Sequence, residues 1–242
     1  LVDVTESLFG LTQGATYNYR LVATNVFGVR FGENRSFVMP NYIFSDTLPN
    51  AWRITDNSQA SGSTVSYSVT LDENQRTEAT SKGWRLSTTT AVTTNFDDTK
   101  SMIFSYGEGD RRFLFWLYLD NSGDLMVELD GDAPLKLTSG GEGATDYHTH
   151  EIEYANGAGT YRFDGALLVS GWDGLPISDR IGRIDWGAGS SGGRGEMKVH
   201  RVEFAIGTNS LASYTAGTAG NPEVAPAPTT QGWTISNTTD TT

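Results

Sequence analysis

Two glutamates two residues apart offer the chemistry of paired carboxylates. Glu151 and Glu153 flank Ile152, and in an extended strand residues two apart point to the same face. Two carboxyl groups facing one substrate could divide the acid and base work of glycoside hydrolysis. However, Ile152 and Tyr154 point to the opposite side from the acids. That alternation is typical of a half-buried strand with one solvated face, so we interpret the two acids as surface groups and assign no catalytic residue.

The same stretch places two histidines on one strand face. His148 and His150 are two residues apart, and the third histidine, His200, is distant in sequence. Imidazoles arranged in this way could bind a divalent metal. The chain has no Cys, and we expect no acid on the face that carries the histidines. We therefore interpret them as histidines of a sheet and keep both as candidate ligand-binding residues.

One turn has the oxygen-rich composition of a calcium loop. Asp120, Asn121 and Asp124 surround a Ser-Gly pair, and hard cations prefer carboxylate and carbonyl oxygens. The stretch lacks the twelve-residue spacing and the closing Glu of an EF-hand. A hairpin turn that needs Asn and Gly for positive φ explains the same letters without a metal. No cofactor is required, and calcium at these three residues stays open.

Tryptophan side chains are the best candidates for a sugar site, because apolar rings with a few polar neighbours line small-molecule pockets. Trp172 stands among glycines and an aspartate, which predicts a loop, and Trp186, Trp84 and Trp52 could also expose a ring. Trp116 lies within an apolar run instead. We expect that ring to be buried and to have a structural role.

The elements that must position these residues are β-strands. The stretch 101–131 reads as three strands joined by tight turns, and its middle segment from Phe113 to Leu119 is apolar on both faces. A strand without polar alternation is covered on both sides. We therefore expect this strand at the centre of the fold.

Further strands are expected on both sides of that centre, and Asp164-Gly165 predicts a two-residue hairpin turn. No stretch shows a convincing apolar period of 3.6. The economical fold is all-β, a sandwich of two packed sheets. The other expected strands are 42–46, 52–55, 64–71, 83–86 with a continuation at 91–94, 135–137, 147–154, 160–163, 166–169, 181–186 and 197–206.

Composition excludes several functions. The formal net charge is −12, which argues against a nucleic-acid partner, since such proteins present a basic face. Without Cys there are no disulfides, and no apolar run approaches the about 20 residues of a membrane span. The chain begins at Leu1 without Met or a signal peptide, so we expect it to be part of a longer protein.

The later strands resemble those of a concanavalin A-like jelly roll, in the branch that includes laminin G, pentraxin and sialidase-accessory domains. The resemblance covers about 42–207 and implies a fold that hosts lectins, enzymes and inert spacers alike. The residues that carry it are Tyr147, His148, Ile152, Asp164, Gly165, Gly171, Trp172, Gly187, Gly195, Val202 and Phe204.

A shorter likeness concerns a jelly-roll enzyme. Arg76, Thr77 and Glu78 resemble the Arg-Thr/Ser-Glu strand motif of alginate lyases. Those enzymes combine this motif with a histidine and a Tyr-x-Lys strand, so the resemblance implies the same partners in this chain. His148 and His150 lack the preceding Gln, and no Lys follows Tyr161 at the required spacing. A polysaccharide lyase or glycosidase therefore remains the alternative function.

The first forty residues resemble the last three strands of a fibronectin type III domain. Leu11, Gly14 and Tyr17 have the spacing of a tyrosine corner, in which the phenol bonds back to the backbone. The first four strands of that family are absent. The resemblance implies a spacer or adhesive unit, whose open edges would need a partner.

We therefore expect four segments: a partial fibronectin-like unit (1–39), a sandwich (40–210), a Pro/Ala/Thr linker (211–230) and a terminal strand or further β unit (231–242). The predicted function is a non-catalytic extracellular or cell-surface module that works in adhesion. Its partners would be copies of itself, which could form a fibre by adding strands to one another's sheets, other extracellular domains, and glycans.

Overall fold

The chain folds into two compact units, Leu1–Ile43 and Phe44–Thr242, in a computed structural model. Each unit is described by itself. The structure describes residues 16–26, 28–38, 51–56, 65–95, 100, 102–141, 143–177, 180–188, 195–217, 225 and 227–236.

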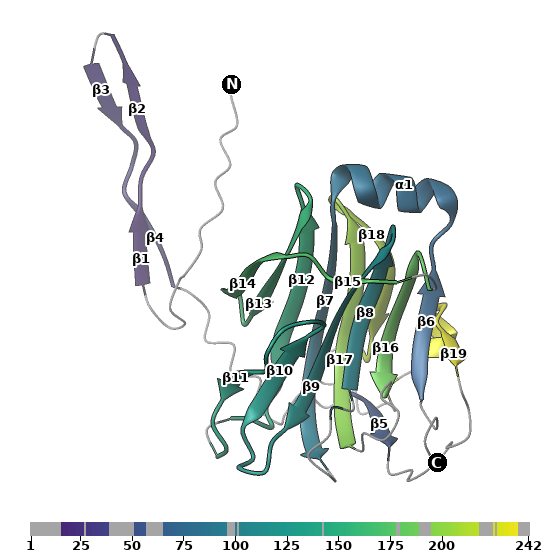
Figure 1. Cartoon of the computed structure of the whole chain (residues 1–242). Helices are drawn as coiled ribbons and strands as arrows, with labels where there is room; N and C mark the ends of the chain where they lie inside the picture. Colours follow the sequence, from purple (N-terminus) through teal and green to yellow (C-terminus); the bar gives the residue numbers. More distant parts are fainter. Residues whose placement is uncertain are drawn as a thin grey trace. The chain divides into compact units, whose positions relative to one another are not determined.

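The described part of the N-terminal unit is one long antiparallel ribbon (Figure 1). Strand β1 (Thr16–Tyr19) pairs with β4 (Arg35–Val38), and β2 (Val22–Asn25) pairs with β3 (Gly28–Phe31). Strand β3 was not expected from the sequence. Tyr17 lies in β1, whereas Leu11 and Gly14 fall outside the described residues, so the tyrosine corner and the fibronectin likeness stay predictions.

The three strands expected around the apolar centre are confirmed. Strands β8 (Met102–Glu108), β9 (Arg111–Leu119) and β10 (Leu125–Leu129) pair in antiparallel order. They lie in an eight-stranded sheet with the order β11-β10-β9-β8-β16-β6-β19, and β15 also pairs with β9. The other strands of this sheet are β6 (Ser66–Thr70), β11 (Leu135–Thr138), β15 (Leu175–Pro176), β16 (Arg183–Ala188) and β19 (Thr234–Ser236).

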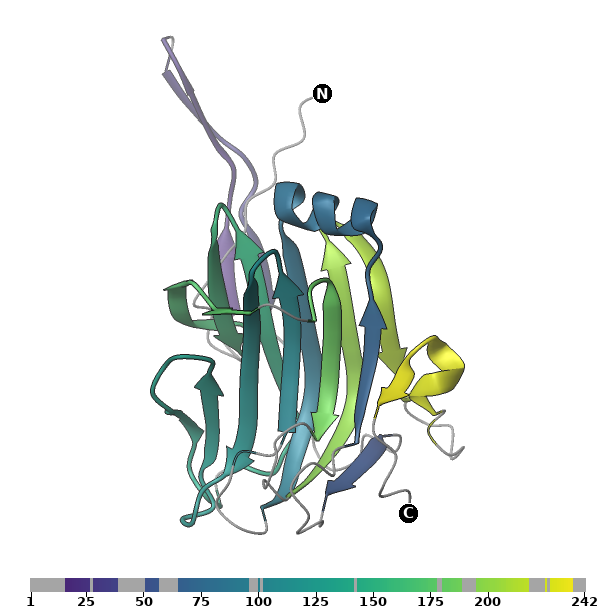
Figure 2. The ribbon, with the colours of Figure 1, turned by 45° about the vertical axis from the view of Figure 1, so that its right-hand side comes forward.

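A seven-stranded sheet packs against it with the order β14-β13-β12-β7-β17-β18, and β5 also pairs with β17 (Figures 1 and 2). Its hairpin between β13 and β14 turns at Asp164 and Gly165, both with positive φ, as predicted. The strands are β5 (Trp52–Asp56), β7 (Trp84–Asn95), β12 (His148–Ala155), β13 (Ala158–Phe163), β14 (Ala166–Trp172), β17 (Gly195–Ile206) and β18 (Asn209–Thr215). The predicted all-β sandwich is therefore confirmed.

The core between the sheets is rich in aromatic rings. The centroid of the Trp84 ring lies 4.9 Å from that of Tyr106 and 5.3 Å from that of Phe113, both of which belong to the other sheet. The Phe113 ring meets Trp172 edge to face at 5.2 Å. Aromatic pairs of this geometry add to the stabilisation from burial. Trp84, Tyr106 and Trp172 are therefore core residues, although sequence patterns alone do not place their rings.

Helix α1 (Glu73–Lys82) contradicts the expectation that the chain has no helix. It lies across one end of the sandwich and contacts β17 and β8 (Figures 1 and 2). Asp72 and Gln75 form a capping box, which satisfies backbone N–H groups at the helix start. Ala79 is its only buried residue, so no apolar period of 3.6 marks it. No helix of the described chain is long and apolar enough to span a membrane.

The last strand adds to the same sandwich. Strand β19 pairs with β6, and the Trp233 indole donates to the Ser213 carbonyl at 3.0 Å. A short 3₁₀ helix (Pro228–Gln231) precedes it. The two sheets therefore extend past the expected boundary at 210. Strand β18 (209–215) crosses that boundary, and β19 (234–236) lies wholly beyond it.

Candidate functional site

The outer face of the seven-stranded sheet carries a row of charged and hydroxyl side chains. Strand β7 lies between β12 and β17. The register sets Ser87 beside Glu151 on one side and beside Glu203 on the other. Because side chains alternate along a strand, these polar groups share the face away from the aromatic core.

The short side chains of β7 form the floor of a trough. Ser87 stands between Glu151 and Glu203, and Thr89 stands beside Arg201, which makes the middle of the face lower than its rims. The resulting cavity measures about 270 Å³. We call this cavity the β7 trough; it is lined by Arg85, Ser87, Thr88, Thr89, Thr149, Glu151 and Arg201.

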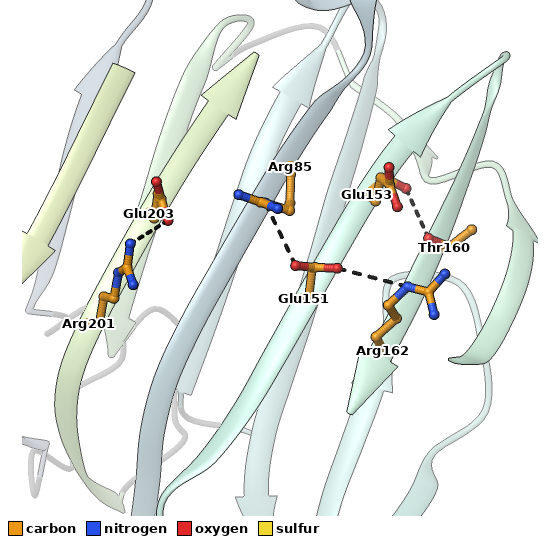
Figure 3. Close-up of polar contacts among 7 residues, drawn as sticks. All are labelled: Arg85, Glu151, Glu153, Thr160, Arg162, Arg201 and Glu203. Atoms are coloured by element: carbon orange, nitrogen blue, oxygen red, sulfur yellow. Dashed lines mark hydrogen bonds and ion pairs between the residues drawn. The ribbon is translucent and has the colours of Figure 1, made fainter. Parts of the chain in front are cut away.

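Ion pairs fix the rim of the β7 trough (Figure 3). Glu151 lies between two arginines, with 3.7 Å to the Nε of Arg85 and 3.9 Å to the Nε of Arg162. On strand β17, Arg201 binds Glu203 at 2.7 Å. The Glu151 pairs are longer than charge-assisted hydrogen bonds. The guanidinium and carboxylate groups therefore keep hydrogen-bonding capacity for a ligand.

Burial changes the electrostatics of the glutamate at the centre. Partial removal of the Glu151 carboxylate from water raises its pKa above the ordinary value. Arg85 and Arg162 act in the opposite direction, and Glu153 and Glu203 add to the increase. A desolvated carboxylate gains from any hydroxyl group that donates to it. Glu151 is thus a natural acceptor for a hydroxylated ligand.

The acids expected as a surface pair, Glu151 and Glu153, do lie on the outer face. Glu153 is exposed, and Thr160 donates to its backbone carbonyl rather than to its carboxylate. Glu151 is partly buried between arginines. The two acids therefore have different environments on the same face.

The histidine pair is oriented inward. The His148 and His150 rings lie 6.5 Å apart between their centroids, and His150 is only 1% exposed. The expectation that no acid shares their face is wrong, because Asp164 Oδ2 lies 2.8 Å from His148 Nδ1. His150 instead bonds the Tyr161 hydroxyl at 2.8 Å. These contacts occupy ring nitrogens that a metal would need.

The oxygen-rich turn is held by its own hydrogen bonds. Asp120 accepts from the backbone of Ser122 and Asp124, and Asp124 accepts from Lys136 and from the Gly140 amide. These bonds lower the pKa of Asp124. Among the described residues no group of three metal-ligating side chains comes together. The contacts support the interpretation of the turn as hairpin geometry.

Three of the four tryptophans proposed for sugar stacking are buried, which corrects that expectation, while Trp52 is partly exposed and its indole donates to the Tyr67 hydroxyl at 3.0 Å. Trp84, Trp186 and Trp172 are 2%, 0% and 6% exposed, because each is packed among other rings of the core. The Trp172 indole also donates to the Asp130 carbonyl at 3.1 Å.

Trp116, expected to be buried, is instead partly exposed on the outer face of the eight-stranded sheet. Lys100 lies over its ring at 4.9 Å and also pairs with Glu128. The central strand is therefore less fully covered than its apolar sequence indicates.

Arg76 lies on helix α1. The suggestion that Arg76, Thr77 and Glu78 form a strand motif like that of alginate lyases is therefore wrong. The Arg76 side chain lies against Gly182 near the Tyr106 end of the core. His148 pairs with Thr90 and Tyr154 pairs with Trp84 in the register of β7 and β12. His148 is thus about 20 Å along the strand from that end. The structure does not bring Arg76 and the histidines together.

Sequence reasoning missed the β7 trough itself. Arg85, Ser87 and Thr89 alternate with Trp84, Leu86 and Thr88, which signals a strand with one polar face. Nothing local in the sequence indicates that 85–89, 149–153 and 201–203 become neighbours.

The fold defines the class of this protein, and similarity in sequence defines its family. The fold is an all-β sandwich of two packed sheets. Residues 53–242 match the family model of the Vibrio cholerae sialidase lectin insertion. The chain therefore belongs to that family. Sialidases of two Vibrio cholerae serotype O1 strains are 31% identical over 177 residues, which is 72% of this chain and 21% of each relative. The chain spans about a fifth of the length of these curated relatives.

Similar solved structures are more distant. Trypanosoma rangeli sialidase bound to a difluorosialic acid has 13% identity and a TM-score of 0.45, covering 68% of this chain and 26% of that one. An alginate lyase of polysaccharide lyase family 7 has 15% identity and a TM-score of 0.36, covering 58% and 62%. Sheep galectin-11 has 14% identity and a TM-score of 0.33, covering 65% and 99%. Likenesses of this degree carry no conclusion about function.

Proposed function

We propose that this chain is a carbohydrate-binding module of a larger extracellular protein, and that the glycan binds in the β7 trough. The observation that carries the proposal is membership of a lectin-insertion family over residues 53–242. The extracellular location follows from the ligand, since most glycans are displayed outside cells. Three further points remain predictions from the sequence. They are a fibronectin-like unit at the N-terminus, a role in adhesion, and strand addition between copies of the chain.

The chemistry of the β7 trough supports this proposal. Sugar hydroxyls both donate and accept hydrogen bonds, and the trough offers both kinds of partner. Arg85 and Arg201 supply planar sets of N–H donors, while Glu151 supplies acceptors. Ser87 and Thr89 can do either. At about 270 Å³, the cavity is near the lower limit of the about 300–1,000 Å³ typical of small-molecule sites.

A non-catalytic role agrees with the arrangement of the acids and histidines. Glycoside hydrolysis needs two carboxyl groups on either side of one bond, whereas Glu151 is engaged by two arginines and Glu153 points to open solvent. The lyase alternative needs Arg76 close to a histidine, and these residues are far apart. The same module could still serve an enzyme by holding its substrate nearby.

A glycan array probed with the whole chain, followed by calorimetry with the strongest-binding glycan, tests the proposal. Ser87→Tyr fills the floor of the β7 trough and is expected to weaken binding at least tenfold. Ser170→Tyr is the matched control, because Ser170 is exposed on the edge strand β14 of the same face. Equal binding by both variants would place the glycan elsewhere, and an array without any signal would contradict the carbohydrate function.

A further inference from the structure

His148 bonds to two parts of the chain that lie on either side of it in the sequence. Its ring lies between the turn of the β13–β14 hairpin, which contributes Asp164, and the glycine-rich segment before β12, which contributes Gly143. The distances are 2.8 Å from Nδ1 to Asp164 Oδ2 and 2.9 Å from Nε2 to the Gly143 carbonyl oxygen. Both are ordinary hydrogen-bond lengths.

Both partners of this ring are acceptors. A carbonyl oxygen has no proton to donate, and an ionised carboxylate has none either. A neutral imidazole carries one N–H group and therefore satisfies only one of the two. The imidazolium form of His148 carries two N–H groups and satisfies both.

We propose that protonation of His148 clamps residues 143–146 onto the β13–β14 hairpin, and that deprotonation releases them. The neutral ring keeps its bond to Asp164, because a hydrogen bond to a charged acceptor is the stronger one. The bond that is lost is the one to Gly143. A lone pair on Nε2 then faces a lone pair on the carbonyl oxygen.

Residues 143–146 and the neighbouring Gly140 make few other contacts within the described part of the chain. The Gly140 amide donates to Asp124 at 2.7 Å, the Asp146 amide donates back to the Gly143 carbonyl at 2.9 Å, and Ala144 is buried. The segment also lines a cavity of about 550 Å³ beside the turn at Ser122 and Gly123. Loss of the His148 bond therefore loosens one wall of that cavity.

The charged groups around His148 favour the protonated ring. Asp164 faces it from the hairpin and Asp146 from the clamped segment, while His150 on its own strand, whose pKa burial lowers to about 3, is neutral and Thr90 beside it on β7 is uncharged. Burial alone lowers the pKa of His148, but Asp164, the Gly143 carbonyl and Asp146 outweigh it and raise the pKa. Since folding raises this pKa, the clamp is complete below about pH 6.5 and is lost as pH rises through the raised value.

Nuclear magnetic resonance of the whole chain tests this inference without any ligand. Ring ¹⁵N shifts report whether both nitrogens of His148 carry protons, and amide exchange at Asp146 and Gly140 reports opening of the segment. After correction for the intrinsic pH dependence of exchange, protection should fall about tenfold as His148 loses its proton, which is the value of one typical hydrogen bond.

Three variants sharpen the test. His148→Gln should make protection at Asp146 independent of pH, and Asp164→Asn should move the transition to lower pH. His200→Gln is the matched control and should change neither. Constant protection while His148 titrates would overturn the clamp, as would a ring that never carries two protons between pH 5 and 9. If His148→Gln fails to fold, the wild-type titration and Asp164→Asn still decide.

Discussion

The two faces of the seven-stranded sheet are made by alternate residues of the same strands, yet they have different chemistry. On β12 the inner residues His150 and Ile152 are 1% and 0% exposed, and they pack with rings of the opposite sheet. The outer residues Thr149, Glu151 and Glu153 remain partly or fully exposed. The inner face therefore contributes most of the stability, while the outer face keeps groups available for a ligand.

The largest expected effect is on the inner face. Phe204→Ala removes a fully buried ring that lies 4.6 Å from Tyr106 and 5.9 Å from Trp84, measured between centroids. The free energy of unfolding should fall by about 3–5 kcal/mol, from lost burial and the cavity that remains. Urea unfolding followed by tryptophan fluorescence measures it. A loss below 1 kcal/mol would show that the inner face is loosely packed.

Acid should also destabilise the inner face, through His150. Burial lowers the pKa of this ring to about 3, so the unfolded chain binds its proton more readily. The contribution is complete above about pH 6.5 and is lost as pH falls toward the lowered value. At pH 4 the stability from this group should be lower by about 3 kcal/mol.

His150→Gln isolates that effect, because the amide can still bond Tyr161 but does not titrate. The difference in unfolding free energy between pH 6.5 and pH 4 should shrink in this variant. His200→Gln, which changes a histidine outside this strand, should retain the wild-type difference. An unchanged slope in His150→Gln would mean that carboxyl groups, rather than this histidine, control the acid response.

The smallest effect on stability is expected on the outer face. Glu151→Gln removes two pairs of 3.7 and 3.9 Å in a partly exposed setting, so the unfolding free energy should change by less than about 1 kcal/mol. Binding of the array-selected glycan should nevertheless weaken about tenfold, since the amide loses an acceptor. Thr160→Val, on the same face outside the β7 trough, is the control. A large loss of stability with unchanged binding would reverse the roles assigned to the two faces.

Much of the fold was predictable, because its signals are local. The apolar run from Phe113 to Leu119 predicted the central strand, and Asp164-Gly165 predicted a two-residue hairpin. Helix α1 was missed since it has almost no buried face, although the capping box of Asp72 and Gln75 was a usable signal. Local patterns therefore identify strands and hairpins well, but they identify a surface helix poorly.

The candidate site was less predictable. Glu151 was recognised as an outward acid, but its ion-pair partners Arg85 and Arg162 come from two other strands, and Arg201, which lines the same trough, comes from a third. Trp172 was assigned to a loop, and Trp84 and Trp186 were candidates for exposed rings, whereas all three fill the core. Residue type alone does not reveal which rings a second sheet will cover.

The sequence by itself determined which residues of each strand share a face, because alternation along a strand is set by backbone geometry within a few residues. Only the tertiary structure decided which strands lie side by side. Pairing of β7 with β12 and β17 joins segments far apart in the chain, and no local pattern specifies such contacts. The β7 trough depends on these long-range contacts, and the His148 clamp depends on the fold that brings Gly143 and Asp164 to opposite sides of one ring.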